Sequence, residues 1–390
     1  MSPQKKYKLF LIIAIALIAF TLRPPLTSVG PLIYEIRLDT GLSNTLLGML
    51  TTLPILVFGL VSVLTPLLTR RIGTEGTMAF ALLVLTAGIL LRVIPTNIAL
   101  FLGTLVLGVG IAFGNVLLPG IVKKSFPEKS GLVTGIYSGM LGIGAAVASG
   151  VSVPLSEDLG LEWRGSLGVW AIFSFVALLF WLPQLRRSIP VVARRSLRES
   201  LKSLGKSSLA WHVSLFMGLQ SFTFYIIIAW LPEILQDRGI GAAEAGWLLA
   251  LCQGVGVIGT FIVPNWAARL STQKFPVLVL IILEMISIIG LMIPNTTFVL
   301  LWVSMLGFSM GACFGVALLF IVLRTRDTQS ANEISGVSQS IGYTIAATGP
   351  ALFGALFDIT AMWSIPLGFL LIISALKLWT GLNAGRRAFI

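Results

Sequence analysis

The stretch that decides the fold is Phe20-Thr21-Leu22-Arg23-Pro24-Pro25-Leu26-Thr27-Ser28-Val29-Gly30-Pro31. It lies inside an apolar run, from about Leu9 to Ile36, that is long enough to cross a bilayer. Arg23 falls near the middle of this run, where a guanidinium costs roughly 2.5–3.5 kcal/mol on insertion scales and cannot shed its proton. Because a lipid-facing position would leave this charge without a partner, we expect Arg23 to face a watery cavity or another polar group.

Two prolines follow the charge and weaken the helix just past it, because proline lacks the backbone donor. Irregular backbone at this depth is tolerated only where protein or a water-filled cavity covers it. At helical spacing Arg23, Thr27, Gly30 and Pro31 share one face, which places a charge, a hydroxyl and a small residue in a row. We interpret this face as one wall of a solute pathway, with Arg23 as its electrostatic centre.

The composition of the chain is that of a polytopic membrane protein. Of its 390 residues, 56% are hydrophobic and only 11% are charged, whereas a soluble domain is about 25% charged. A soluble fold could not bury that much apolar surface. The two cysteines, Cys252 and Cys313, lie in apolar segments, so we expect them to pack in the interior rather than to form a disulfide.

Twelve apolar segments follow one another along the chain. They lie at about 9–36, 43–68, 76–95, 97–122, 131–154, 165–185, 209–234, 243–268, 275–293, 297–323, 332–357 and 362–384. The connections are short except for one basic segment between the sixth and the seventh. The sequence therefore predicts an all-α membrane protein with twelve transmembrane helices in two pseudo-symmetric six-helix bundles, 1–186 and 209–390, joined by a cytoplasmic linker, 187–208.

The lysines and arginines between the segments predict the orientation. Of the 27 basic residues, 22 fall on the side of the two termini, Lys377 among them, and Arg23 lies in the membrane. The four that remain on the opposite side are Arg37, Arg92, Arg164 and Arg238. The positive-inside rule then places both termini and the linker in the cytoplasm. The net charge of +12 is thus explained by topology and by attraction to anionic lipid, without a nucleic-acid partner.

The two halves of the chain resemble each other. At a constant offset of 198 the matching residues are Gly48, Pro66 and Arg71 in the second segment and Gly246, Pro264 and Arg269 in the eighth. Later matches drift to an offset of 205, as a duplicated six-helix unit with small loop changes would show. Parallel six-helix halves around a central cavity place the substrate near the midplane, at their interface.

The layout of two six-helix halves, the long basic central loop and the Thr69-Arg70-Arg71-Ile72-Gly73 turn resemble the major facilitator superfamily. More narrowly, Leu22-Arg23-Pro24-Pro25-Leu26-Thr27-Ser28-Val29-Gly30-Pro31-Leu32 is similar to the first helix of the cyanate permease and 2-nitroimidazole transporter subfamily. Ala229-Trp230-Leu231-Pro232 in the seventh segment is also similar to that subfamily. The resemblance implies a small, often anionic or heteroaromatic solute and leaves the direction of transport open.

Nine residues are candidates for contact with the solute. They are Arg23, Thr27, Asn115, Tyr137, Gln220, Phe224, Tyr225, Gln339 and Tyr343. Gln220, Phe224 and Tyr225 lie at mid-depth in the seventh segment, the counterpart of the first, where an amide and aromatic rings would suit a small planar anion. Each candidate has a structural alternative: amides join membrane helices by hydrogen bonds, and aromatic rings pack in cores.

Glu284 is the only carboxylate at the centre of an apolar segment, which leaves two roles open. A buried glutamate without a partner would have a raised pKa and could carry a proton. Alternatively, a protonated Glu284 donates a hydrogen bond to a neighbouring helix and has a structural role only. The resemblance favours this role, because the ninth helix of the implied fold supports the bundle from outside.

We therefore predict a secondary active transporter, a symporter or exchanger in the cytoplasmic (inner) membrane. It moves a small anionic or polar heteroaromatic solute, cyanate-like or nitroimidazole-like, by alternating access. A drug or antimetabolite exporter of the same fold is the main alternative, and a sensor that binds without transport is another. A membrane enzyme is disfavoured, because the interior holds one carboxylate and no clustered metal ligands. No nucleotide-binding loop is present, and we expect a monomer without cofactor, metal or nucleic-acid partner.

Overall fold

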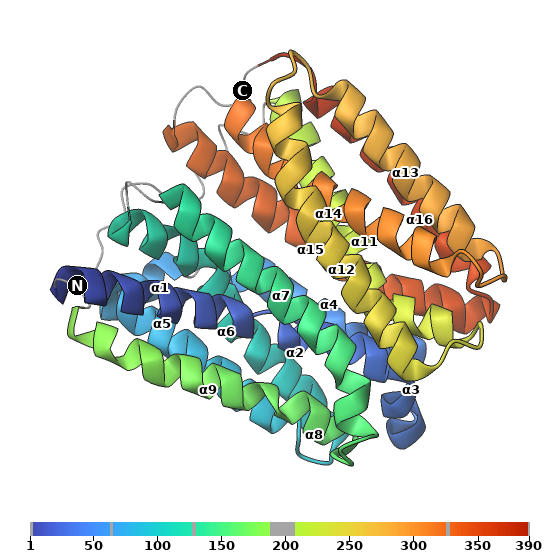
Figure 1. The fold of residues 1–390 in the computed structure, drawn as a ribbon, viewed down its shortest axis with the longest axis horizontal. Helices are drawn as coiled ribbons and strands as arrows, with labels where there is room; N and C mark the ends of the chain where they lie inside the picture. Colours follow the sequence, from blue (N-terminus) through green and yellow to red (C-terminus); the bar gives the residue numbers. More distant parts are fainter. Residues whose placement is uncertain (1–2, 63–64, 127–129, 188–206, 325–327, 389–390) are drawn as a thin grey trace.

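The computed structural model describes residues 3–62, 65–126, 130–187, 207–324 and 328–388, all helices and connections without a strand in these ranges (Figure 1). The first half comprises α1 (Pro3–Thr21), α2 (Pro24–Thr27), α3 (Val29–Thr40), α4 (Asn44–Ser62), α5 (Thr65–Leu91), α6 (Asn97–Ser125), α7 (Ser130–Ser156), α8 (Glu162–Gly168), α9 (Trp170–Trp181) and the 3-10 helix η2 (Leu182–Arg187). The second half comprises α11 (Ser208–Gln236), α12 (Ala242–Ala267), α13 (Lys274–Met292), α14 (Val299–Leu323), α15 (Thr328–Thr360) and α16 (Ser364–Ala384).

Within the described ranges, twelve helical spans are long and apolar enough to cross a membrane, which confirms the predicted fold class. The chain is thus a multi-pass membrane protein. Residues 188–206, which make up most of the predicted linker, lie outside the described ranges.

The first span is broken into three helices, α1, α2 and α3, at Leu22–Arg23 and at Ser28. Pro24 and Pro25 occupy the first two positions of α2, where their fixed φ suits the first turn and their missing N–H groups cost nothing. The carbonyl of Arg23 accepts hydrogen bonds from the N–H groups of Leu26, at 3.0 Å, and of Thr27, at 3.2 Å. The prolines therefore begin a new short helix directly after the charge, and Arg23 is its N-cap residue.

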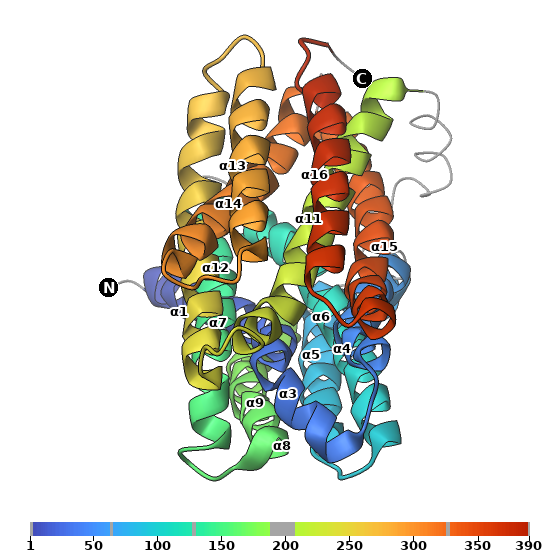
Figure 2. The ribbon, with the colours of Figure 1, turned by 90° about the vertical axis from the view of Figure 1, so that its right-hand side faces the viewer.

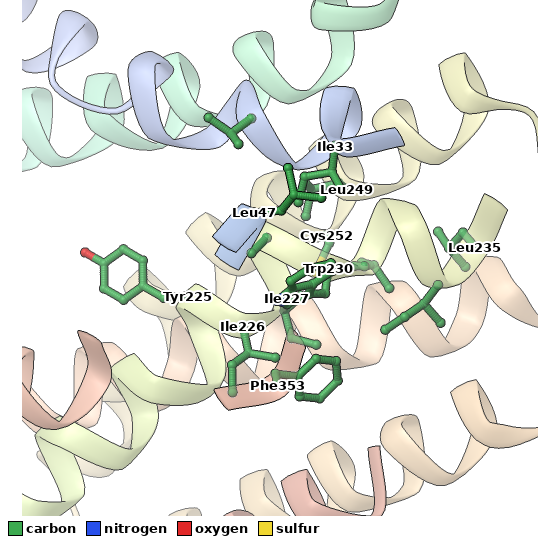
Figure 3. Packing of buried hydrophobic residues seen from close by; sticks show 14 of the residues in the cluster. Ile33, Leu47, Tyr225, Ile226, Ile227, Trp230, Leu235, Leu249, Cys252 and Phe353 are labelled. Carbon is green, nitrogen blue, oxygen red and sulfur yellow. The ribbon is translucent and has the colours of Figure 1, made fainter. Parts of the chain in front are cut away.

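The two halves share one hydrophobic core at one end of the molecule. We call this end the Arg37 end, and the opposite end, where α1 begins and α16 ends, the termini end. Helix α3 lies against α11 and α12, α4 against α15, and α7 against α12 (Figure 2). The shared core combines residues such as Ile33 and Leu47 with Ile227, Trp230 and Phe353 (Figure 3). The buried residues of each of two further core clusters come from one half alone. In Figure 1 the halves lie together at the α3 end and diverge toward the chain termini.

Backbone contacts at glycines bring the halves together at the Arg37 end. A Cβ on Gly30 of α3 would lie 2.1 Å from the carbonyl oxygen of Ile228 in α11. A Cβ on Gly48 of α4 would lie 2.5 Å from the carbonyl oxygen of Pro350 in α15. Larger side chains at these two positions would push the halves apart.

Polar side chains also link the halves at this end. Arg37 Nη1 pairs with Glu233 Oε1 at 2.7 Å, and Arg37 Nη2 donates to Asn44 Oδ1 at 2.6 Å. Asp358 of α15 accepts hydrogen bonds from the backbone N–H groups of Asn44, at 3.1 Å, and of Thr45, at 2.9 Å. A carboxylate from one half thus caps the first turn of a helix in the other, where negative charge is favourable.

Two basic residues that the sequence analysis assigned to the membrane surfaces are buried instead. Lys377 of α16 is 0% exposed, and its Nζ lies 2.5 Å from Glu284 Oε2. Arg92, directly after α5, is 1% exposed and donates from Nη1 to the carbonyl oxygen of Pro25 at 2.8 Å. Both surface positions were predicted because each residue lies within two helical turns of the end of a span, where long basic side chains usually reach the surface. The structure shows both side chains buried, so these predictions were wrong.

Candidate functional site

The guanidinium of Arg23 lies at the break of the first span and contacts the other half of the molecule. Its Nη1 donates a hydrogen bond to Tyr225 Oη of α11 at 3.2 Å. Arg23 is half-buried, whereas Tyr225 is only 2% exposed. Figure 3 shows Tyr225 at the edge of the shared core, with its hydroxyl pointing away from the hydrophobic residues. The two groups therefore meet between the halves rather than within either one.

A second phenol, Tyr343 of α15, accompanies this pair. Its side chain interacts electrostatically with Arg23. Tyr343 packs against core residues of both halves, and its ring meets Phe58 of α4 edge-on, with 5.9 Å between ring centroids. The N-cap position of α2 and the helices α11 and α15 thus contribute to one polar group of a cation and two phenols.

The positive charge of Arg23 has no carboxylate partner in the described part of the chain. A guanidinium carries five N–H donors, and Tyr225 accepts from one nitrogen only. A buried charge is normally paired, because its desolvation is costly. The arrangement can therefore bind an anion or a strong hydrogen-bond acceptor, and such a ligand would supply the missing counter-charge.

A family model described as Major Facilitator Superfamily matches residues 9–350. The chain belongs to this superfamily. The 2-nitroimidazole transporter of Escherichia coli (strain K12) is 38% identical, over 99% of this chain and 98% of that protein. The cyanate transport protein CynX of the same strain is 28% identical, over 92% of this chain and 93% of that protein.

A solved structure supports the same fold for this facilitator-superfamily protein. The crystal structure of a bacterial homolog of the human lysosomal transporter Spinster, inward-facing and unoccupied, superimposes with a TM-score of 0.78. The match covers 99% of this chain and 96% of that one at 15% identity, and it therefore supports the fold alone. The resemblance drawn from the first and seventh segments is thus confirmed at the level of family and subfamily by the relatives.

In this superfamily member the residues of the predicted wall, Arg23, Thr27, Gly30 and Pro31, have different neighbours. Thr27 is 1% exposed, and its hydroxyl donates to the carbonyl oxygen of Ala145 in α7 at 3.1 Å. Gly30 instead packs on the backbone of α11. Arg23 and Gly30 thus both meet α11, while Thr27 bonds to α7, and contact of this face with a solute stays a prediction.

The other candidates on α11 differ in their surroundings. Gln220 is 3% exposed, and its Nε2 donates to Ser221 Oγ of the same helix at 2.7 Å. Phe224 is half-buried, and its ring meets that of Tyr225 edge-on at 5.3 Å between centroids. Phe224 therefore extends the aromatic surface beside the cation, while the amide of Gln220 is occupied by its own helix.

Three more candidates are half-buried on other helices. Asn115 lies on α6, Tyr137 on α7, and Gln339 on α15, one helical turn before Tyr343. Their contact with a solute stays a prediction.

The sequence analysis did not single out Gln253 of α12, which reaches across to the other half. Its Nε2 donates to Ser149 Oγ of α7 at 2.6 Å, and Ser149 Oγ lies 3.2 Å from the carbonyl oxygen of Thr27. Gln253 is thus linked through one side chain to the helix that Arg23 caps. The available signal was an amide at mid-depth of an apolar segment, the same kind of signal that drew attention to Asn115.

Glu284 occupies a separate site within the second half. Besides Lys377, it accepts a hydrogen bond on Oε1 from Ser374 Oγ of α16 at 2.6 Å. Lys377 Nζ also lies 3.4 Å from Thr223 Oγ1 of α11. Both carboxylate oxygens of this 0% exposed side chain therefore have partners, and the expected protonated acid is replaced by an ion pair. A role in proton coupling stays a prediction.

Proposed function

We propose that this superfamily transporter is a secondary active transporter for a small anionic or polar heteroaromatic solute, which it moves across the cytoplasmic membrane by alternating access. The observation that carries the proposal is the Arg23–Tyr225 hydrogen bond, which joins an uncompensated cation of one half to a phenol of the other. A solute bound there would contact both halves at once. Its binding would therefore respond to their relative movement.

The chemistry of the site favours a planar anion. A fixed charge in a poorly solvated site attracts an anion far more strongly than it would in water. The planar fork of Arg23 offers parallel N–H donors to two acceptor atoms of a flat solute. The phenols of Tyr225 and Tyr343 can each donate one O–H, and the ring of Phe224 offers an apolar surface.

The relatives support the solute class. One is named a 2-nitroimidazole transporter and one a cyanate transport protein. Both names describe small solutes with flat or linear frameworks and several acceptor atoms. An exporter of larger amphipathic compounds with the same fold remains the alternative to be tested.

The contacts between the halves at the Arg37 end support a transport cycle in which this structure is one of the two end states. Because the distribution of basic residues favours cytoplasmic termini, we infer that a molecule joined at the Arg37 end is closed to the outside. Opening to the outside requires the Arg37–Glu233 pair and the cap of Asp358 on α4 to separate. A monomer contains all of the residues that this cycle uses.

Uptake into proteoliposomes tests the proposal. Cyanate, nitrate and 2-nitroimidazole are first screened by the shift each causes in the thermal unfolding temperature, because a ligand that binds only the folded state raises it. Uptake of a hit distinguishes a transporter from a sensor, and its sidedness distinguishes import from export. Stabilisation without uptake would reject transport of that solute. Larger amphipathic compounds are screened in the same way, and hits confined to them would favour the exporter over the small-anion site.

A maleimide experiment tests the orientation. A Ser203→Cys substitution places a thiol in the predicted linker, outside the described residues. We expect labelling only from the cytoplasmic side; labelling by an impermeant maleimide in intact cells would reverse the assigned topology.

A further inference from the structure

Arg92 is a second buried arginine of this transporter, and it lies next to the break in the first span. It is 1% exposed, and its one described hydrogen bond runs from Nη1 to the carbonyl oxygen of Pro25 at 2.8 Å. Its Nε and Nη2 atoms are buried without a described partner. No described carboxylate pairs with it. Burying a guanidinium without a carboxylate partner costs free energy. The hydrogen bond to α2 therefore indicates what the buried arginine does.

The carbonyl of Pro25 needs a donor because the helix is interrupted. In the interior of a membrane protein each backbone carbonyl must find a partner, since no bulk water reaches it. Helix α2 ends at Thr27, and the N–H of Val29, which would bond to Pro25 in a continuous helix, makes no such bond among those described. Arg92 supplies the donor that the interruption requires.

The side chain of Arg92 has little freedom to move away from this carbonyl. A Cβ on Gly103 of α6 would lie 2.7 Å from Arg92 Cγ, so the stem of the arginine packs directly on the α6 backbone. On its opposite side α2 is bonded to α7, through the hydroxyls of Thr27 and Ser149. The four-residue helix is therefore fixed from two directions.

We propose that Arg92 is a positioning residue for the solute site: by bonding the Pro25 carbonyl it fixes α2 and leaves the Arg23 guanidinium free to bind solute. Arg23 caps α2 and lies two residues before Pro25, so the same bond fixes its backbone. Without Arg92, an unsatisfied carbonyl two residues away would compete with the solute for the donors of Arg23. The effect on solute binding rests on the proposed function, whereas the effect on α2 does not.

Arg324 provides the matched control. It is 4% exposed, and its Nε donates to the carbonyl oxygen of Ala384 at 2.8 Å, within the second half. Arg324 Nη2 also donates to Gln273 Oε1, so Arg324→Met removes a buried arginine–carbonyl bond and one further hydrogen bond, at a place that does not contact α2.

Two measurements on the purified full-length protein test the role of Arg92. Hydrogen–deuterium exchange of the peptide that contains residues 26–30 reports on α2 without any ligand, and titration with cyanate and with 2-nitroimidazole reports on the site. We expect Arg92→Met to speed this local exchange and to weaken binding about tenfold, the value of one hydrogen bond to a charged group. Arg92→Lys should restore part of both, and Arg324→Met should change neither.

Equal losses of affinity in Arg92→Met and Arg324→Met, or unchanged exchange and affinity in Arg92→Met, would overturn the positioning role. If the wild-type protein binds neither probe, the proposed solute class fails, and the exchange measurement alone decides whether Arg92 holds α2. If Arg92→Met does not fold, the same two measurements are made on Arg92→Lys and Arg92→Gln. Both side chains keep an N–H donor but are shorter than arginine.

Discussion

Arg23 and Lys377 are both cations inside membrane spans, but their surroundings differ. Lys377 is 0% exposed, lies 2.5 Å from a carboxylate oxygen of Glu284, and has all of its partners in the second half. Arg23 is half-buried, bonds to a phenol of the opposite half, and has no described carboxylate. One charge is neutralised inside a rigid unit, and the other is left open between two units.

This difference separates a structural charge from a charge that can bind a solute. A neutralised pair within one half keeps its partners while the halves move against each other, so it stabilises that half in every conformation. An unneutralised cation between the halves loses and gains partners during the same movement. The contrast predicts that Lys377 variants lose stability and that Arg23 variants lose affinity.

The largest effect is expected for Lys377→Met. Removing one partner of a buried ion pair leaves the other charge uncompensated and typically costs about 3–5 kcal/mol. We expect a large fall in the thermal unfolding temperature and a low yield of folded protein. Glu284→Gln combined with Lys377→Met removes both charges and should recover most of the loss, which unfolding monitored by intrinsic fluorescence would measure.

The double variant also tests the role of Glu284 as a proton carrier. Retained uptake with an unchanged dependence on the pH gradient would assign the pair to structure. Binding that survives while accumulation driven by the pH gradient disappears would instead make Glu284 the coupling residue.

Arg23→Ala should have the next largest effect, on binding alone. Truncating one partner of a buried, hydrogen-bonded charge pair costs about 2–5 kcal/mol, or some 30- to several-thousand-fold in affinity. The stability should hold, because Arg92 and not Arg23 bonds the Pro25 carbonyl. Titration of cyanate into the purified variant, together with its unfolding temperature, measures both quantities.

A stably folded Arg23→Ala protein with wild-type affinity would remove the anion site. Arg23→Lys sharpens the result, because lysine keeps the charge but loses the planar fork. We expect partial binding with poorer discrimination among planar anions.

The sequence was sufficient to predict the spans and the burial of Arg23, because both follow from hydropathy and from the cost of a charge in an apolar run. The partners of Arg23 are distant in the sequence: Tyr225 follows 202 residues later, and Tyr343 lies further still. Their identity therefore depends on how the two halves pack together. The same holds for Lys377, whose carboxylate is 93 residues distant. A lysine near a span end reaches the surface unless a buried acid faces it, and one sequence does not say which residues face each other.

The break in the first span is a second feature that the sequence predicts only in part. Prolines predicted a weakened helix, and the break is present. The extent of the break was not predictable, because it depends on donors from other helices, such as Arg92 and Ser149, that bond the released backbone. Arg23 and Ser28, which flank α2, keep right-handed helical φ/ψ angles, so the break lies in the backbone hydrogen bonds rather than in the dihedral angles.

Tyr225→Phe tests how much of the Arg23 site belongs to the opposite half, and a smaller effect is expected. The change removes one hydroxyl and keeps the ring. A hydrogen bond to a charged group is worth about 1.5–3 kcal/mol, so affinity should fall about 10- to 150-fold at most. Tyr34→Phe is the control, because Tyr34 is 47% exposed on α3. Equal affinities in the wild-type protein and Tyr225→Phe would show that the phenol does not contribute to binding.

The smallest effect is expected for Glu233→Gln, which extends the comparison to a pair that crosses the halves. Glu233 pairs with Arg37 at the Arg37 end, and partly exposed ion pairs contribute about 0.2–1 kcal/mol. Loss of the charge should shift the population about two- to fivefold toward molecules open at this end. A Leu47→Cys reporter in the shared core, 0% exposed here, should then react faster with maleimide. Protein without the reporter gives the background of the buried Cys252 and Cys313.

Asp39→Asn supplies the control for this measurement, because Asp39 of α3 pairs with Arg164 of α8 at the same end but within one half. Losing that pair removes an acidic charge from the same end of the molecule without removing a link between the halves. We therefore expect the Leu47→Cys reporter to react at its original rate in Asp39→Asn. Equal acceleration in both variants would mean that local charge at the reporter, rather than opening of the halves, sets the labelling rate. Acceleration in Glu233→Gln alone would place Arg37 between the two cations compared above: paired, as Lys377 is, but across the surface that must open, as Arg23 is.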